Sequence, residues 1–153
     1  MIKIYDRNGL ELLVYYPKSG CDLDPLYLPN VNLEMAELEG KELSEANFEN
    51  ANLRNANLYW AILYKANLKN ADLTNADLCG ADLKEVNLQG AKLVGANLGK
   101  NNLGGATQLQ GADLRGANLT NAIMSGAEFD ENTQFPDHFE AYTHGMVYKH
   151  ASS

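Results

Sequence analysis

Leucine recurs at every fifth position along most of this chain, and this spacing is its strongest pattern. With each leucine-type residue taken as position i, the register runs from Leu23 to Leu103. It resumes from Leu109 to Phe129 after one extra residue near 107–108. Of the 22 centres, 19 are leucine. Position i−2 is alanine in 15 of the 22, and position i−1 is asparagine or aspartate in 14. So many repeats in phase indicate a periodic architecture.

A period of five excludes the two commonest regular structures. An α-helix turns 100° per residue, so the leucines would drift around it, and a continuous strand would turn them to alternate sides. A short extended segment followed by a corner keeps positions i−2 and i inside. Four such corners close a square of about 20 residues, and successive squares stack about 4.8 Å apart. The chain is therefore predicted to form a rod of about 5.5 coils and about 26 Å.

The repeats Ala46-Asn47-Phe48, Ala71-Asp72-Leu73 and Ala117-Asn118-Leu119 resemble those of the pentapeptide-repeat family. This resemblance implies an all-β fold, the right-handed quadrilateral parallel β-helix. Alanine fits where the wall leaves room for only a methyl group. Asparagine and aspartate tolerate turn dihedrals and bond to nearby backbone amides. The tail segments Thr133-Gln134-Phe135-Pro136 and Gly145-Met146-Val147 are similar to C-terminal tails of cyanobacterial members.

Both ends of an open solenoid need a cap, because the last leucines and strand edges are otherwise exposed. Residues 1–20 are predicted to form a β-hairpin with Asn8-Gly9 in a type I′ turn. Residues 21–131 form the β-helix, and the one-residue insertion near 107–108 bulges at one corner without breaking the stack. Residues 132–153 form a C-terminal cap or tail. The apolar residues expected to cover that end are Phe135, Pro136, Phe139, Tyr142, Met146, Val147 and Tyr148.

Charge and hydropathy narrow the function classes. The chain of 153 residues has a formal net charge of −8, which disfavours direct binding to nucleic acid or to an anionic membrane surface. Residues 22–49 carry eight acids and one base, whereas residues 50–128 carry six acids and seven bases. The longest apolar or aromatic run, Leu12 to Tyr16, is too short for a membrane span. With no signal-peptide pattern at the N-terminus, a cytoplasmic location is expected.

No motif in the chain predicts catalysis, a metal site or a cofactor. The tail histidines His138, His144 and His150 lack a known ligand spacing. Asp72, Asp77 and Asp82 occupy the i−1 wall position of the repeat, which favours a structural role. Cys79 at position i+1 is predicted to be a plain surface thiol, and Cys21 and Cys79 are too few for a disulfide framework. We therefore expect a protein that is not an enzyme.

One stretch departs from the polar surface pattern. Between the inward centres Leu58 and Leu63, the residues Tyr59, Trp60 and Ile62, followed by Tyr64, are predicted to point outward around one corner. Twenty residues either way from Trp60 stand Gly40 and Gly80, which leave room for the indole along the wall. Two interpretations stay open: a contact site for a partner or a second copy, or a corner covered by the chain's own caps.

The sequence thus favours a non-enzymatic scaffold that mediates protein–protein interaction and regulates or bridges another protein, whose identity the sequence does not give. The chain is expected to be a monomer or weak homodimer. The alternative is a DNA mimic that binds DNA gyrase and protects it from quinolones, because the resembled family includes such proteins. Near-neutral middle coils, no long loops projecting from the coils and no C-terminal helix for a dimer seam all disfavour this alternative.

Overall fold

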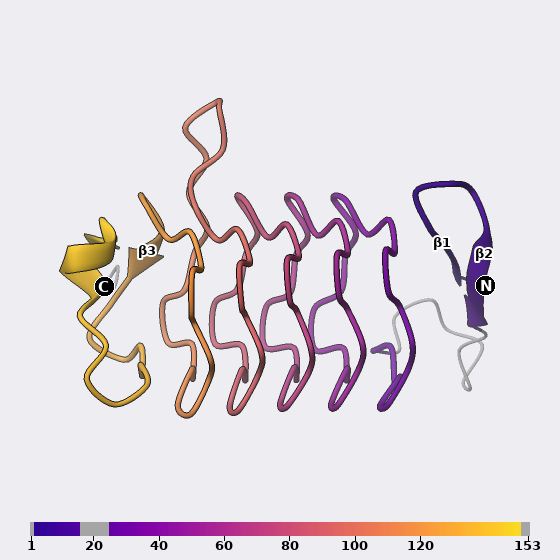
Figure 1. Cartoon of the computed structure of the whole chain (residues 1–153), viewed down its shortest axis with the longest axis horizontal. Helices are drawn as coiled ribbons and strands as arrows, with labels where there is room; N and C mark the ends of the chain where they lie inside the picture. The colour runs from indigo at the N-terminus through magenta and orange to yellow at the C-terminus, as the bar shows by residue number, and fades with distance from the viewer. Residues whose placement is uncertain (1, 16–24, 151–153) are drawn as a thin grey trace.

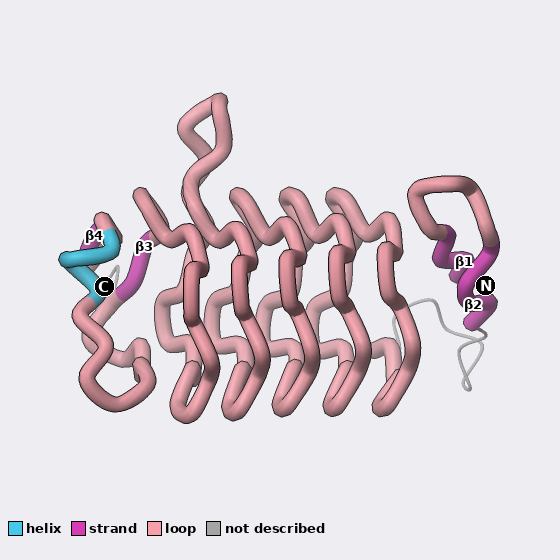
Figure 2. The backbone as a smooth tube through the Cα atoms, viewed as in Figure 1, coloured by secondary structure: helices cyan, strands magenta, loops and turns pink. Residues whose placement is uncertain are grey.

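The computed structural model of the chain describes residues 2–15 and 25–150, which form a capped solenoid (Figures 1 and 2). Single parallel β-bridges join each coil to the next, as between Asn52 and Asp72. Leu23 and Cys21 lie outside the described residues. The bridged positions form four columns, which define face 1 (Tyr27, Asn47, Asn67, Asn87, Asp113 and Gln134), face 2 (Asn32, Asn52, Asp72, Lys92 and Asn118), face 3 (Glu37, Asn57, Asp77, Asn97 and Ile123) and face 4 (Glu42, Ile62, Asp82, Gln108 and Glu128).

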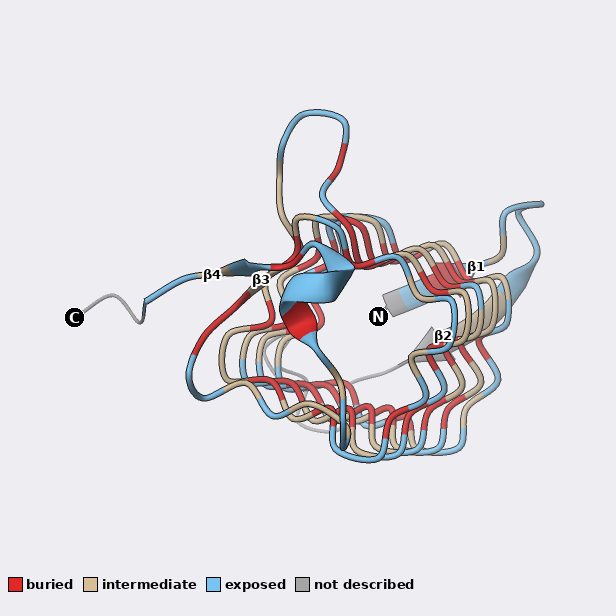
Figure 3. Cartoon of the chain, turned by 60° about the vertical axis from the view of Figure 1, so that its left-hand side comes forward, coloured by how far each residue is buried: buried red, intermediate tan, exposed pale blue. Residues whose placement is uncertain are grey.

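The core of the solenoid consists of the stacked leucines and alanines. The centres Leu33 to Leu98 and the alanines two positions before them are buried, whereas the rest of the ring alternates between half-buried and exposed residues (Figure 3). Burial of leucine contributes about 2 kcal/mol per side chain, which is the main source of stability in a fold with so little regular secondary structure. The predicted inward positions are confirmed along this range.

Most corners are tight turns in which one residue has a left-handed backbone. The N–H of Ala71 donates to the carbonyl of Leu68 at 3.0 Å, and Asn70 between them has φ +57°. A positive φ at the third residue of a four-residue turn is typical of type II turns, where glycine and asparagine cost least. This geometry explains why position i+2 is so often glycine or asparagine in this chain.

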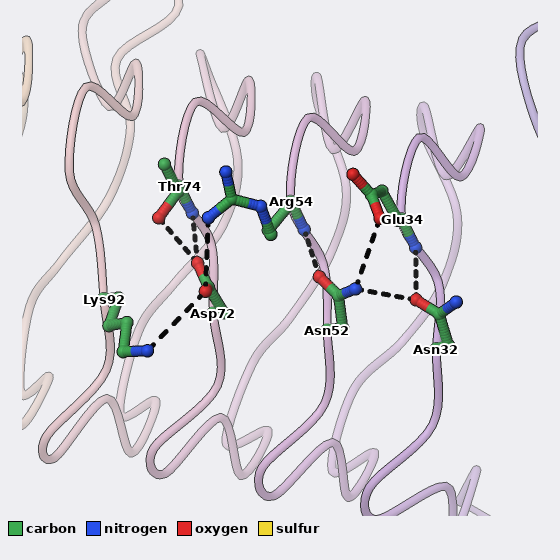
Figure 4. Close-up of polar contacts among 7 residues, drawn as sticks. All are labelled: Asn32, Glu34, Asn52, Arg54, Asp72, Thr74 and Lys92. Atoms are coloured by element: carbon green, nitrogen blue, oxygen red, sulfur yellow. Dashed lines mark hydrogen bonds and ion pairs between the residues drawn. The ribbon is translucent and has the colours of Figure 1, made fainter.

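The asparagine and aspartate side chains at i−1 stabilise both the turn and the stack. The Oδ1 atom of Asn52 accepts the backbone N–H of Arg54 at 3.2 Å, while its Nδ2 donates to Oδ1 of Asn32 one coil away at 2.8 Å (Figure 4). On the same face, Asp72 lies 3.4 Å from the Arg54 guanidinium and 3.8 Å from the Lys92 ammonium. The expected backbone bonds are therefore present on this wall, and side-chain hydrogen bonds between successive coils accompany them.

The N-terminal cap is a hairpin, as predicted, but its turn differs from the prediction. Strands β1 (Ile2–Tyr5) and β2 (Glu11–Tyr15) pair antiparallel, and Asp6 continues onto the first coil by an antiparallel bridge to Ala36. Only Gly9 of the Asn8-Gly9 pair has positive φ, so the turn is not type I′. The carboxylate of Asp6 instead accepts the backbone N–H groups of Asn8 and Leu10, which stabilises a longer loop.

The C-terminal cap extends the stack by one more pairing. Strand β3 (Glu128–Phe129) pairs parallel with β4 (Val147–Tyr148), and the 3₁₀ helix η1 (Ala141–His144) lies between them. The ring of Phe129 packs edge-to-face against Phe135, Tyr142 and Tyr148. Met146 is buried, but Tyr142 and Val147 stay exposed, so the tail closes the core with only part of the predicted apolar set.

The insertion is larger than the sequence register indicated. Face 4 runs from Asp82 to Gln108 and face 1 from Asn87 to Asp113, a step of 26 residues where the preceding coils take 20. The six additional residues form a loop that projects from one corner (Figure 1). Leu103, predicted to be a buried centre, is 88% exposed in this loop. The expectation of a one-residue bulge and of no projecting loop is therefore wrong, while the stack does continue unbroken beyond it.

An acid-sensitive contact on face 1 yields a prediction about stability. Hydrogen bonds from the Arg115 guanidinium lower the pKa of Asp113 to about 2. A depressed folded-state pKa stabilises the protein above the unfolded value near 4, and this stabilisation is lost as pH falls from about 4 to about 2. We expect Asp113→Asn to lower the free energy of unfolding by about 1–2 kcal/mol at neutral pH and to reduce its decrease between about pH 4 and pH 2. Urea unfolding at pH 2–6 measures both. An unchanged pH profile would contradict the assignment.

Candidate functional site

The aromatic corner, defined as Tyr59 and Trp60, joins face 3 to face 4. Trp60 has φ +57° and occupies the left-handed i+2 position, where this chain usually has asparagine or glycine. Its indole is 47% exposed, so it is a large apolar side chain at a position that needs none for folding. The neighbours in its column are Gly40 and Gly80, and Trp60 donates its backbone N–H to the carbonyl of Cys79.

The base of the projecting loop packs against Trp60. A Cβ on Gly80 would lie 3.0 Å from Nε1 of Trp60, and a Cβ on Gly105 would lie 3.0 Å from its Cζ2. The Cβ positions on Gly80 and Gly105 would also lie 3.1 and 2.6 Å, respectively, from Nδ2 of Asn101. Glycine at both positions therefore gives the indole room to lie along the wall, and the exposed part of its ring faces outward beside the loop.

The aromatic run does not gather at a single corner, as the sequence had suggested. Tyr59 and Trp60 form one corner, Ile62 lies exposed in the middle of face 4, and Tyr64 occupies the next corner. The Tyr64 hydroxyl donates to Glu85 at 3.0 Å, and the Lys65 ammonium lies 4.9 Å from the Tyr64 ring centre. Tyr64 thus lies one corner beyond Trp60, which leaves Tyr59, Trp60 and Ile62 as the part of the run nearest to the indole.

The projecting loop has a rigid base. The Oδ1 atom of Asn101 accepts the N–H groups of Leu103 and Gly105, both at 2.8 Å. Thr107 is buried, and its hydroxyl accepts the N–H of Gly80 at 2.9 Å and lies 2.8 Å from the carbonyl oxygen of Gly99. The direct distance from the Gly80 N–H to the Gly99 carbonyl is 3.4 Å, longer than the other backbone hydrogen bonds between coils. The Thr107 hydroxyl therefore supplements this weak hydrogen bond at the insertion.

Sequence reasoning missed this loop, although a signal was present. At the supposed centre Leu103, position i−2 is Asn101 in place of the usual alanine, and two glycines follow. A buried i−2 position beside the wall accepts little more than a methyl group, so an asparagine there argues against the repeat register. Leu103, exposed on the loop, therefore adds to the candidate contact surface, while Asn101 is buried at the base of the loop.

Face 3 beside the aromatic corner is hollowed into a groove of about 500 Å³. The Nδ2 atom of Asn57 at its floor donates to Glu37 at 2.7 Å and to Glu39 at 3.3 Å. Asp77 accepts hydrogen bonds from the amide of Asn97 and the backbone of Cys79. The lining includes Arg7, Glu37, Glu39, Asn57, Tyr59 and Asp77.

The groove carries more negative than positive charge. Arg7 from the hairpin donates to the backbone carbonyl of Asn55 at 2.9 Å. In the part of the chain that the structure describes, no ion pair within 4.0 Å involves Glu37, Glu39, Asp77 or this guanidinium. Three carboxylates thus face solvent with only amide partners and a single nearby cation. The aromatic corner forms one edge of this acidic wall.

Cys79 is buried rather than exposed, which corrects the prediction of a surface thiol. Only 6% of it is accessible, because it lies in the column between Tyr59 and Gly99 at the base of the loop. Burial is the main cause that raises the pKa of this thiol, and the neighbouring Asp77 adds to it. A thiol with a raised pKa is a poor nucleophile, so the position favours packing over reactivity.

The tail histidines do not converge on one point. His144 stacks on Phe139 with ring centres 4.4 Å apart, and His150 packs edge-on against Tyr148. Within residues 2–15 and 25–150, no group of three or more histidine, cysteine or acidic side chains is placed to hold a metal ion. The same residues include no helix with the length and hydrophobicity that a membrane span requires.

The bridges, the leucine core and the type II corners together define a quadrilateral β-helix whose exposed side chains sit on flat walls. The family model for pentapeptide repeats matches eight copies over residues 21–63, 42–78, 61–99 and 105–131. The chain belongs to the pentapeptide-repeat family, and its fold is the right-handed quadrilateral β-helix. The matched segments leave out residues 100–104, within the projecting loop.

Solved structures of other pentapeptide-repeat proteins are similar to this chain. One is Rfr23 from the cyanobacterium Cyanothece 51142, with 34% identity over 76% of this chain and 88% of the other, and a TM-score of 0.67. Another, from the thylakoid lumen of Arabidopsis thaliana, has 28% identity over 72% of this chain and 66% of the other, and a TM-score of 0.50. No curated protein matches the chain.

Proposed function

We propose that this protein is a cytoplasmic, non-enzymatic scaffold that binds another protein through the aromatic corner. The half-exposed indole of Trp60 is the observation that carries this proposal. A tryptophan costs more to leave in water than the asparagine or glycine that serves the same turn elsewhere in the chain. Tryptophan and tyrosine are also enriched at the centres of protein interfaces.

The surroundings of the corner support the same function. Ile62 on face 4 and Leu103 on the loop add exposed apolar area to either side of Trp60. Asn101 and Thr107 hold the base of the loop by hydrogen bonds, so presenting Leu103 to a partner requires little ordering. Tyr64, which is tied to Glu85, is left out of the proposed contact.

Substitution of the indole tests the proposal. We expect Trp60→Ala to weaken partner binding by about 1–3 kcal/mol and to leave the thermal unfolding midpoint nearly unchanged. Immobilised wild-type and variant protein would be compared by quantitative mass spectrometry of what each retains from an extract of the source cell. Ile123→Ala is the matched control, because Ile123 is 55% exposed on face 3 outside the groove.

Fluorescence provides the internal check, since Trp60 is the only tryptophan. A dilute monomer is expected to emit at the wavelength of a solvent-exposed indole. Emission typical of a buried indole, together with a clear loss of thermal stability in Trp60→Ala, would mean that the chain itself covers the corner. Equal retention by Trp60→Ala and wild type would also count against the contact.

The alternative, a DNA mimic that protects gyrase, is disfavoured by the distribution of charge. Residues 50–128 carry six acids and seven bases, so the middle coils offer no continuous track of negative charge to replace phosphates. We expect micromolar protein to give no protection of gyrase from a fluoroquinolone in a supercoiling assay. Protection that is lost when residues 101–105 are shortened would favour the alternative, because the projecting loop removes one of the arguments against it.

A further inference from the structure

From the acidic wall next to the aromatic corner, we infer that the partner contacts this protein through a basic segment with an apolar anchor. The anchor packs on Trp60, and lysine or arginine side chains lie in the face 3 groove. This inference rests on the proposed function and adds the chemistry of the partner. The surface is continuous, because Tyr59 belongs both to the corner and to the groove lining.

The groove carboxylates have no ion-pair partner among the described residues, and this determines the charge expected of the partner. Glu37 and Glu39 share a single amide donor, Nδ2 of Asn57, and the hydrogen bonds of Asp77 all reach its Oδ1. No ammonium or guanidinium within the described residues lies within 4.0 Å of these three groups. Arg7 is the single cation in the groove lining, so the mutual repulsion of the carboxylates is only partly relieved in the free protein. An arriving cation relieves it further, while an arriving carboxylate increases it.

The other walls near the corner do not offer the same field. On face 4, Asp82 already lies 3.3 Å from the Lys84 ammonium. On face 2, Asp72 is neutralised by two bases, Arg54 and Lys92. Face 3 therefore differs from these walls in combining unpaired carboxylates with a groove and an exposed tryptophan at its edge.

The spacing of the acids favours a chain of separate basic groups over a single ion. Glu37 and Asp77 occupy the same column two coils apart, a distance of about 9.6 Å between backbones. Metal binding needs ligands that converge, and the described residues contain no such group. An extended peptide presents every second side chain to the same face, so two basic side chains two residues apart, about 6.6 Å, both face the groove, and their long stems reach toward its two ends.

The test uses a pair of fluorescein-labelled peptides and the intact protein. One peptide carries two lysines two residues apart followed by two leucines, and the other has glutamates in place of the lysines. Fluorescence anisotropy at 0.1 M salt gives the affinity, and emission from Trp60 reports whether the peptide reaches the corner. We expect the lysine peptide to bind at least about tenfold more tightly than the glutamate peptide and to shift the Trp60 emission.

Two double variants with the same change in net charge locate the binding. Glu37→Gln with Glu39→Gln removes groove charge but keeps oxygen acceptors for Asn57. Glu34→Gln with Glu45→Gln removes two exposed acids that lie outside the groove lining. We expect the groove pair to weaken the lysine peptide by about five- to tenfold and the control pair by less than about twofold. Circular dichroism checks that both variants fold.

The outcomes separate this inference from the function on which it rests. Equal losses in the two double variants would show attraction by net charge alone and overturn the groove assignment. Equal affinity for both peptides, each weakened by Trp60→Ala, would overturn the charge assignment while the corner remains a contact site. Failure of the lysine peptide to bind at millimolar concentration would overturn the inference, and the extract experiment with Trp60→Ala would still decide the scaffold proposal.

Discussion

Leu73→Asp is expected to unfold the protein, whereas Leu103→Asp is expected to leave its stability almost unchanged. Leu73 has no exposed surface and lies inside the square among other leucines. An aspartate there has no partner for its charge, and burial of an unpaired charge or protonated carboxyl costs at least about 4 kcal/mol. That loss is comparable to the total stability of many small domains.

Leu103 is the matched control, because the five-residue pattern assigns both leucines the same inward position. In the structure it is 88% exposed on the projecting loop, where a charge stays hydrated. Thermal unfolding followed by circular dichroism distinguishes the two variants. Should Leu73→Asp fail to accumulate, Leu73→Ala, expected to cost about 2–5 kcal/mol, provides a measurable substitute. Similar effects at positions 73 and 103 would contradict the register observed here.

Gly90→Ala is expected to have the second-largest effect, about 2–4 kcal/mol of destabilisation. Gly90 has φ +66°, and a Cβ there would lie 2.5 Å from Oδ1 of Asn70 in the coil before it. Asn70 is held in turn by a bond from its Nδ2 to Asn50 at 3.3 Å, so moving it disrupts the ladder. Urea unfolding of the variant measures the cost.

Two further variants separate steric overlap from backbone strain. Gly40 has a similar φ of +60°, but a Cβ there would meet nothing within 4 Å. Gly40→Ala is therefore expected to cost about 1 kcal/mol, the strain of the left-handed backbone alone. In the double variant Asn70→Gly with Gly90→Ala, the steric part of the destabilisation should disappear, so that only the backbone strain seen in Gly40→Ala remains. No recovery in the double variant would mean that the Asn70 amide is not the cause.

Most of the fold was predictable because each five-residue repeat has the same residue preferences and forms the same side and corner of the solenoid. Side-chain volume places leucine in the square and alanine at its wall, and the requirement for positive φ places asparagine and glycine at corners. These preferences act within five residues, so the pattern indicates them directly. The caps were predictable as apolar segments at each end. The Asn8-Gly9 turn was not, because the carboxylate of Asp6 stabilises a different loop.

The candidate site was only partly predictable. The pattern identified Trp60 and its glycine neighbours, since positions 20 residues apart lie in one column. It placed Tyr64 at the same corner and Cys79 on the surface, and both assignments were wrong. Tyr64 follows the next inward centre, Leu63, and therefore lies at the next corner, where its hydroxyl bonds to Glu85. Burial of Cys79 depends on the base of the loop, a contact that the five-residue pattern does not contain.

The five-residue repeat is sufficient to predict a leucine-filled square solenoid with walls of asparagine and aspartate, because the same steric preferences recur in every coil. The exit of the residues near Leu103 from the core as a loop is visible only in three dimensions, since a single leucine in register satisfies the pattern whether or not it is buried. Contacts between Trp60 and Gly105, 45 positions apart, depend on how much length the insertion adds at one corner. Packing in three dimensions therefore set the shape of the surface where a partner is expected to bind.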